Sequence, residues 1–119
     1  MTKKILIVED DISIRELLEE LLRAEAYDVM TAAHGMEALD KLRKEQLPHL
    51  ILMDLMMPVL DGYGLRKELL MNSNWSSIPV VAMSAEVNAA EKIRQFGVQA
   101  FLSKPVDIDT ILQTIEKYS

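Results

Sequence analysis

The sequence contains no cysteine, and this absence excludes a disulfide framework and any thiolate metal site. Glycine and proline occur only four times each, and no low-complexity segment or repeat interrupts the chain. No apolar run approaches the roughly 20 residues that a membrane span needs. We therefore expect a cytoplasmic protein in a reducing compartment, with no membrane as a partner.

Positive charge is also scarce, with 13 lysines and arginines against 19 acidic residues and a net charge of −6. This balance disfavours direct binding of nucleic acid by this segment. Half of the 119 residues are hydrophobic, which is enough for one domain with a real core. We expect residues 1–119 to form that single domain.

Short aliphatic runs alternate along the chain with longer segments of helical period. The runs predict strands at residues 4–8, 28–32, 50–53, 80–83 and 100–102. Strands that alternate with helices favour parallel βαβ units, and right-handed crossovers then place helices on both faces of one open sheet.

Four of the intervening segments have clear helical patterns. In the first, Ser13 and Glu16 have the spacing of a capping box, and the apolar positions that follow predict a core face. Asp107 is the expected N-cap of the last helix. The apolar positions of the four helices are Ile14, Leu17, Leu18, Leu21 and Leu22; Ala38, Leu39 and Leu42; Leu65, Leu69 and Leu70; and Ile108, Ile111, Leu112 and Ile115.

A weaker helix lies between the fourth and fifth strands. Asn88 and Glu91 form a capping signal, but the apolar anchors are little more than Ala89, Ile93 and Phe96. A segment with few buried contacts is the easiest to redistribute. We expect this fourth helix to be the least firmly held.

Chemically unusual residues stand where the strands end. Glu9 and Asp10 follow the first strand, and Asp54 follows the third. Ser84 follows the fourth strand and Lys104 comes soon after the fifth. Ligands of open parallel sheets bind beyond the carboxyl ends of the strands. If the first and third strands are neighbours, these side chains share one pocket, with Asp54 at a solvent-facing strand end.

Three carboxylates in one pocket repel one another unless a cation offsets them. Mg²⁺ is the natural cation, because it prefers oxygen ligands and commonly binds one or two carboxylates together with water and phosphate. Lys104 and Ser84 are suited to holding phosphoryl oxygens, and a carboxylate can form an aspartyl phosphate. Asp54 is the candidate nucleophile. Asp11 is better interpreted as a helix N-cap or loop charge than as a ligand.

Four motifs, in this order and spacing, resemble the receiver domains of two-component response regulators, including the chemotaxis regulator. They are ILIVEDD, MDLMMPVLDG, VVAMSA and AFLSKP. The similarity covers the whole chain. It implies an α/β, flavodoxin-like fold with a five-stranded parallel sheet in the order 2-1-3-4-5 and five helices on its two faces.

The resemblance also implies a phosphorelay function. Asp54 would be the phosphoacceptor, receiving a phosphoryl group from a histidine kinase or a histidine phosphotransfer protein. Mg²⁺ would be held by Glu9, Asp10, Asp54 and the backbone carbonyl of Met56. The downstream partner or output domain is not identified by the sequence.

By the same resemblance, Ser84 and Lys104 would bind the phosphate, and the Lys104–Pro105 peptide would be cis. Ser84 and Phe101 would form the switch. A shift of Ser84 toward the phosphate would let Phe101 turn inward and change the face made by the fourth helix, the fifth strand and the last helix.

Three other functions are consistent with parts of the pattern. A flavodoxin-like cofactor binder shares the fold, although the acidic loop after the first strand would repel a phosphate in the absence of a metal. A metal-dependent phosphatase could act through an aspartyl phosphate. An adaptor that is never phosphorylated would need no metal. We expect a signalling protein rather than an enzyme.

Overall fold

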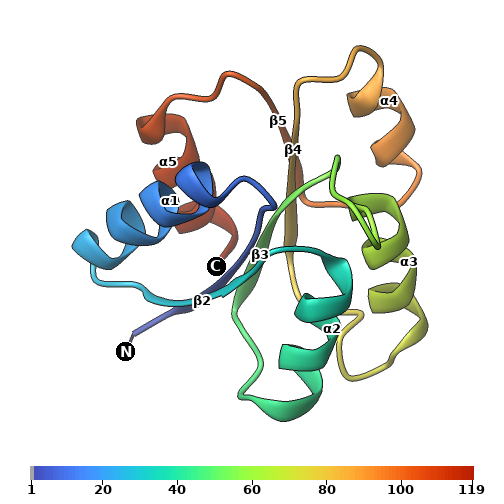
Figure 1. Cartoon of the computed structure of the whole chain (residues 1–119), viewed down its shortest axis with the longest axis horizontal. Coiled ribbons are helices and arrows are strands. Elements are labelled where there is room, and N and C mark those ends of the chain that lie inside the picture. Colours follow the sequence, from blue (N-terminus) through green and yellow to red (C-terminus); the bar gives the residue numbers. More distant parts are fainter. Residues whose placement is uncertain (1) are drawn as a thin grey trace.

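The computed structural model describes residues 2–119, which form one open parallel sheet with helices on both faces (Figure 1). The strand order is β2-β1-β3-β4-β5, which confirms the predicted fold. The strands are β1 (Lys4–Val8), β2 (Asp28–Ala32), β3 (Leu50–Asp54), β4 (Val80–Ser84) and β5 (Ala100–Ser103). β3, β4 and β5 each run one residue further than predicted.

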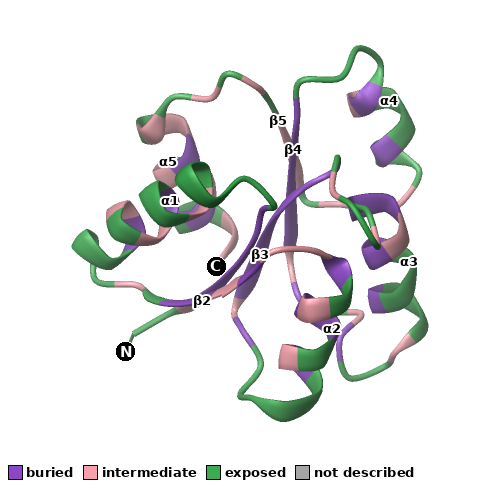
Figure 2. Cartoon of the chain, viewed as in Figure 1, coloured by how far each residue is buried: buried purple, intermediate pink, exposed green. Residues whose placement is uncertain are grey.

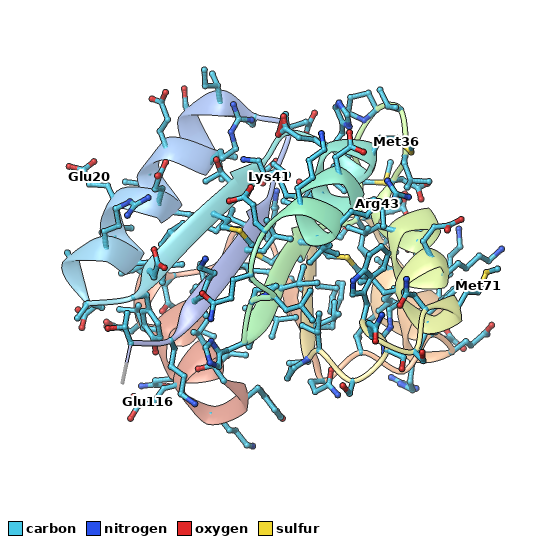
Figure 3. All side chains as sticks on the ribbon, turned by 90° about the horizontal axis from the view of Figure 1, so that it is seen from below. Glu20, Met36, Lys41, Arg43, Met71 and Glu116 are labelled. Atoms are coloured by element: carbon cyan, nitrogen blue, oxygen red, sulfur yellow. The ribbon has the colours of Figure 1, made fainter. Side chains whose placement is uncertain are left out.

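One helix follows each strand. α1 and α5 cover one face of the sheet, and α2, α3 and α4 cover the other (Figure 1). The helices are α1 (Ile12–Ala24), α2 (Gly35–Lys44), α3 (Gly62–Met71), α4 (Ala89–Arg94) and α5 (Ile108–Tyr118). Charged side chains such as Glu20 on α1 and Glu116 on α5 point outward (Figure 3).

The sheet separates two hydrophobic cores, because successive side chains of a strand point to opposite faces. Leu6 and Val8 pack toward α2, α3 and α4, whereas Ile5 and Ile7 pack toward α1 and α5. β3 and β4 are buried along their whole lengths (Figure 2). Burial on both faces is the condition under which parallel strands become almost continuously apolar.

At the start of α1 the interpretation of Asp11 as a helix N-cap is confirmed, but the capping box is not. The N-cap is Asp11 rather than Ser13, and the Asp11 carboxylate accepts a hydrogen bond of 3.1 Å from the Ile14 N–H. Asp11 lies directly before the first helical residue and has an extended backbone. This conformation directs its carboxylate toward the free N–H groups of the first turn, so Asp11 rather than Ser13 caps the helix. The predicted capping box of Ser13 and Glu16 is therefore wrong.

The predicted core face of α1 is also only partly correct. Leu18 and Leu22 are buried, but Ile14 and Leu17 are 38 % and 54 % exposed. They line an apolar groove of about 610 Å³ whose other wall includes Val106. Ile108 and Ile111 of α5 line the same groove, so α5 covers this side of α1 only in part.

α4 is the shortest helix of the described chain, with six residues. Ala89 and Ile93 are buried as expected, and Phe96 lies half-buried beyond the helix end. Asn88 does occupy the N-cap position, but its φ is 71° and its side chain caps nothing. An N-cap normally has an extended backbone, and the left-handed conformation turns the side chain away from the N–H groups it would bond.

A membrane span needs a helix of roughly 20 predominantly apolar residues. Among residues 2–119, no helix combines the necessary length with the necessary apolar character.

Candidate functional site

The register of the sheet brings the predicted site residues to one edge. Val8 pairs with Met53, Asp54 with Met83, and Ser84 with Ser103. The carboxyl ends of four adjacent strands therefore lie side by side, although they are far apart in sequence. Asp54 and Ser84 are the last residues of their strands, so the backbone of the sheet itself fixes their positions.

Three carboxylates gather at this edge. Glu9, Asp10 and Asp54 each offer one oxygen, and these oxygens lie within 4.8 Å of one another. Asp10 is exposed, whereas Glu9 is 1 % and Asp54 only 5 % exposed. The expectation that Asp54 faces solvent is therefore wrong.

Lys104 reaches over both buried acids. Its Nζ lies 2.6 Å from Asp54 Oδ2 and 3.1 Å from Glu9 Oε1. Burial alone would lower the pKa of Lys104, but its hydrogen bond to Asp54 and the charges of both carboxylates raise that pKa overall. Lys104 is therefore a fixed positive charge, and its contact with Asp54 helps to explain why that acid is shielded from water.

A single ammonium does not fully offset this negative charge. Burial, followed by the charge of Asp54, raises the pKa of Glu9 to about 7, even though the Asp11 N–H and Lys104 act in the opposite direction. A further cation would stabilise the ionised form of these buried, mutually repelling carboxylates. The donors are all oxygen atoms, and the exposed Asp10 opens the cluster to solvent, so the residues present suit a hard divalent ion such as Mg²⁺.

Backbone contacts hold the acids in place. The Glu9 N–H donates to the Ala32 carbonyl at 3.0 Å, and Asp54 Oδ1 accepts from the Met56 N–H at 3.0 Å. Arg15 on α1 donates from Nη1 to the Glu9 carbonyl at 2.8 Å, which ties the acidic loop to the helix. The sequence analysis missed Arg15. Arg15 could have been found from its position four residues after the Asp11 N-cap. Residues four apart in a helix lie on the same side, so a long side chain at this position can reach the loop before α1.

The start of α3 is pressed against the end of β3. The Gly62 N–H donates to the Leu55 carbonyl at 3.0 Å. A Cβ atom at Gly62 would lie 2.7 Å from Leu55 Cα and 2.9 Å from the Asp54 carbonyl oxygen. Only glycine allows this approach. The glycine after Asp61 is thus needed for contact with the Asp54 strand end.

Ser84 and Lys104 are joined through the backbone, because the Lys104 N–H donates to the Ser84 carbonyl at 2.9 Å. Ser84 is 1 % exposed, and its Oγ accepts a 3.0 Å hydrogen bond from the Glu86 N–H. The hydroxyl hydrogen of Ser84 is left free to donate elsewhere. The Lys104–Pro105 peptide bond is cis.

Phe101 lies on the same face of the sheet as Ser84. It pairs with Ala82, two residues before Ser84, and side chains two apart on a strand share a face. Phe101 is half-buried and packs against the core beneath α3 and α4. Met56, in contrast, is 53 % exposed at the rim of the site.

The sequence matches a known family over most of its length. A family model described as the response regulator receiver domain matches residues 5–116. The chain belongs to this family. It is thus a receiver domain of the two-component, phosphorelay type, and the family match separates it from the flavodoxin-like cofactor binders that share its fold.

Individual receiver proteins resemble the chain along its whole length. The polar-differentiation response regulator DivK of Brucella ovis is 38 % identical over 120 residues, which cover 99 % of this chain and 97 % of DivK. The structure of the chemotaxis response regulator CheY4 of Vibrio cholerae is similar with a TM-score of 0.90 at 32 % identity, and the match covers all of both chains.

A second similar structure carries a metal. It is the receiver domain of a sensor histidine kinase from Pseudomonas aeruginosa, described with a magnesium ion coordinated in its active site cleft. The TM-score is 0.89 at 28 % identity, over 99 % of this chain and 98 % of the other.

Proposed function

We propose that this receiver domain accepts a phosphoryl group on Asp54 in an Mg²⁺-dependent reaction. The donor would be the phosphohistidine of a histidine kinase or of a histidine phosphotransfer protein, and the protein would work in the cytoplasm. The observation that carries the proposal is the contact of Lys104 with Asp54 at the carboxyl end of β3, beside two further acids.

The chemistry assigned to Asp54 is a nucleophilic displacement at phosphorus. A carboxylate oxygen of Asp54 forms the new bond to phosphorus while the bond from phosphorus to the donor nitrogen breaks, and the electron pair of that bond remains on the donor imidazole. The product is an aspartyl phosphate. The carboxylate needs no base, because it carries no proton when it attacks.

Glu9, Asp10, Asp54 and the backbone carbonyl of Met56 would hold the Mg²⁺. When bound, the ion supplies positive charge that offsets the carboxylates and the phosphoryl oxygens. Lys104 would contribute a second cation to the phosphoryl group. Its Nζ already lies 2.6 Å from Asp54 Oδ2, so a group bonded to Asp54 would be within easy reach.

Ser84 and Phe101 would transmit the modification. The free hydrogen of the Ser84 hydroxyl can donate to a phosphoryl oxygen, and movement of Ser84 would alter the space available to Phe101 on the same face. The expected result is a population shift of the face formed by α4, β5 and α5, which would contact the downstream partner.

Mass spectrometry after incubation with acetyl phosphate and Mg²⁺ tests the proposal. One added phosphoryl group is expected, and borohydride reduction before digestion should place it on Asp54. D54N should remain unmodified, while D40N, which changes an exposed acid on α2, should be modified normally. Modification of D54N in similar yield would refute the assignment.

That experiment, together with an assay of phosphomonoester hydrolysis, separates the alternative functions. We propose a signalling protein with a single modification and no turnover of substrates. Steady hydrolysis of a phosphomonoester that is lost in D54N would instead indicate a phosphatase acting through an aspartyl phosphate. Complete absence of Mg²⁺-dependent modification would indicate an adaptor that is never phosphorylated.

A further inference from the structure

The C-terminal end of α4 is held by a neighbouring helix in addition to its own backbone hydrogen bonds. Arg66 on α3 donates from Nε to the Phe96 carbonyl at 2.9 Å and from Nη2 to the Gly97 carbonyl at 3.0 Å. Both carbonyls belong to the turn that directly follows α4. Gly97 has a φ of +69°, the left-handed conformation in which helices commonly end.

Arg66 is an unusual residue for its position. It is 3 % exposed, and no carboxylate among residues 2–119 forms an ion pair with it. Its Nη1 is buried and has no hydrogen-bond partner in the described part of the chain, and burial lowers the pKa of the guanidinium. An apolar side chain of similar length would avoid this desolvation cost. Compared with such an apolar side chain, the guanidinium adds the hydrogen bonds to the Phe96 and Gly97 carbonyls.

A second residue on the same side of α3 supports the contact. Tyr63 lies three residues before Arg66, so the two side chains project from the same side of the helix. The Tyr63 ring centroid is 5.8 Å from that of Phe96, and Lys92 Nζ of α4 lies 4.2 Å from the Tyr63 ring. One side of α3 therefore contacts both α4 and the turn after it.

α4 has little else to fix its position. Its N-cap makes no side-chain hydrogen bond, and only Ala89 and Ile93 are buried. A helix held by so few contacts has a low free energy of local opening. The hydrogen bonds from Arg66 therefore add to the two backbone bonds of the turn, from the Phe96 N–H to the Ile93 carbonyl and from the Gly97 N–H to the Arg94 carbonyl, in fixing where α4 ends.

The first residue of α3 contacts the acidic site. Gly62, the first residue of α3, donates to the Leu55 carbonyl and packs against the Asp54 carbonyl oxygen. Tyr63 and Arg66 follow within the next turn. A continuous path of packed groups therefore runs from the Asp54 strand end through the first turns of α3 to the turn after α4.

We propose that Arg66 is a positioning residue that fixes the C-terminal end of α4 and couples it to Asp54 through α3. This connection is separate from the one through Ser84 and Phe101. The anchoring of α4 by Arg66 is a property of the unmodified protein. The coupling to Asp54 rests on the proposed phosphoacceptor function.

Hydrogen exchange of the full chain tests the anchoring without metal or phosphoryl group. R66M removes both donors but keeps a long side chain, and should accelerate exchange across residues 89–98 about tenfold, the effect of losing roughly one hydrogen bond to a charged group. K67M, at the exposed neighbouring position, is the matched control and should change nothing there. Exchange in α2 should be the same in all three proteins.

Two results would overturn the anchoring. One is unchanged exchange across residues 89–98 in R66M. The other is an equal acceleration in every helix, which would mean that Arg66 only stabilises the core. R66Q provides a second reading if R66M folds poorly, because its amide retains one donor group. It should give a smaller acceleration than R66M in the same segment, and the absence of any acceleration would overturn the anchoring.

Beryllofluoride, a phosphoryl mimic, tests the coupling. With Mg²⁺ present, the change that it causes across residues 89–98 should be smaller in R66M than in K67M, because the α3 connection is lost. An equal change in both variants would overturn the coupling. If beryllofluoride changes nothing in the unmutated protein, the proposed output face is wrong, whereas the anchoring measured without beryllofluoride stands by itself.

Discussion

Lys104 Nζ lies 2.6 Å from Asp54 Oδ2, and this contact joins two residues that are 50 positions apart in sequence. The same ammonium also bonds Glu9 at 3.1 Å. Lys104 therefore provides part of the positive charge that the buried acids require. Neutralising Asp54 or adding a cation should change the ionisation of Glu9 without large changes in the fold.

The first prediction concerns pH and Glu9. Its pKa is about 7 in the folded protein against an ordinary value of 4.5. Between these pH values the folded chain retains a proton that the unfolded chain has lost, so the contribution of Glu9 to stability falls as pH rises. Without metal, the free energy of unfolding should decline between about pH 5 and 7, by at most about 1.4 kcal/mol per pH unit.

Denaturant unfolding at several pH values measures this slope. E9Q should reduce it, because the amide does not titrate. Saturating Mg²⁺ should also remove it, since a bound cation favours the ionised carboxylate. A slope that is the same in E9Q would show that another group is responsible.

The second prediction separates Asp10 from Asp11. D10A should raise the Mg²⁺ concentration required for half-maximal modification by acetyl phosphate roughly tenfold or more, because it removes a proposed ligand. D11A should have little effect on that concentration. It should instead lower the free energy of unfolding by about 1 kcal/mol, since Asp11 is the N-cap of α1. Equal increases in the Mg²⁺ requirement would show that the acidic loop has been misassigned.

The third prediction concerns Arg15, which donates to the Glu9 carbonyl at 2.8 Å and holds the acidic loop. R15M should weaken Mg²⁺ binding although it removes a positive charge near the acids, because the loop loses its attachment to α1. Electrostatics alone predicts stronger binding, so the sign of the change decides between the two effects. R23M, which removes an exposed arginine at the last turn of the same helix, is the control. Isothermal titration with Mg²⁺ gives the affinities.

The sheet and its edge were predictable because their signals are local. A parallel strand buried on both faces is continuously apolar, so the first polar residue after it marks the carboxyl edge of the sheet. Glu9, Asp54 and Ser84 were found in this way, and Lys104 comes one residue after Ser103, the first polar residue beyond the fifth apolar run. The exposure of Ile14 was not predictable, because helical periodicity shows which side of α1 is apolar but not how far α5 extends along it.

Other features depend on contacts between distant segments. The burial of Asp54 involves the coverage by Lys104, which follows β5, whereas Asp54 ends β3. The spacing to Leu69 and Leu70 places Arg66 on the apolar side of α3 and Lys67 on the other, but the sequence does not show what the buried guanidinium binds. Its partners are the carbonyls of Phe96 and Gly97, 30 and 31 residues away. Every residue has a backbone carbonyl that can accept a hydrogen bond, so the sequence does not show which carbonyls Arg66 binds.

The fourth prediction separates binding of the phosphoryl group from transmission of the resulting change to α4. S84A should still accept a phosphoryl group on Asp54, because Lys104 and the acidic cluster remain. It should nevertheless show a smaller change in hydrogen exchange across residues 88–96 on addition of beryllofluoride and Mg²⁺. The reason is that Ser84 is the donor whose movement displaces its own strand end and the space beside Phe101.

K104A should lose the response of residues 88–96 more completely than S84A, since it removes the cation proposed to bind the phosphoryl group and the partner of two buried acids. Differential binding typically supplies only a few kcal/mol, and α4 is the helix that such an amount can redistribute, because it has six residues and two buried side chains. If beryllofluoride does not change hydrogen exchange across residues 88–96 in the unmutated protein, the proposed output face is wrong, even if Asp54 proves to be the phosphoacceptor.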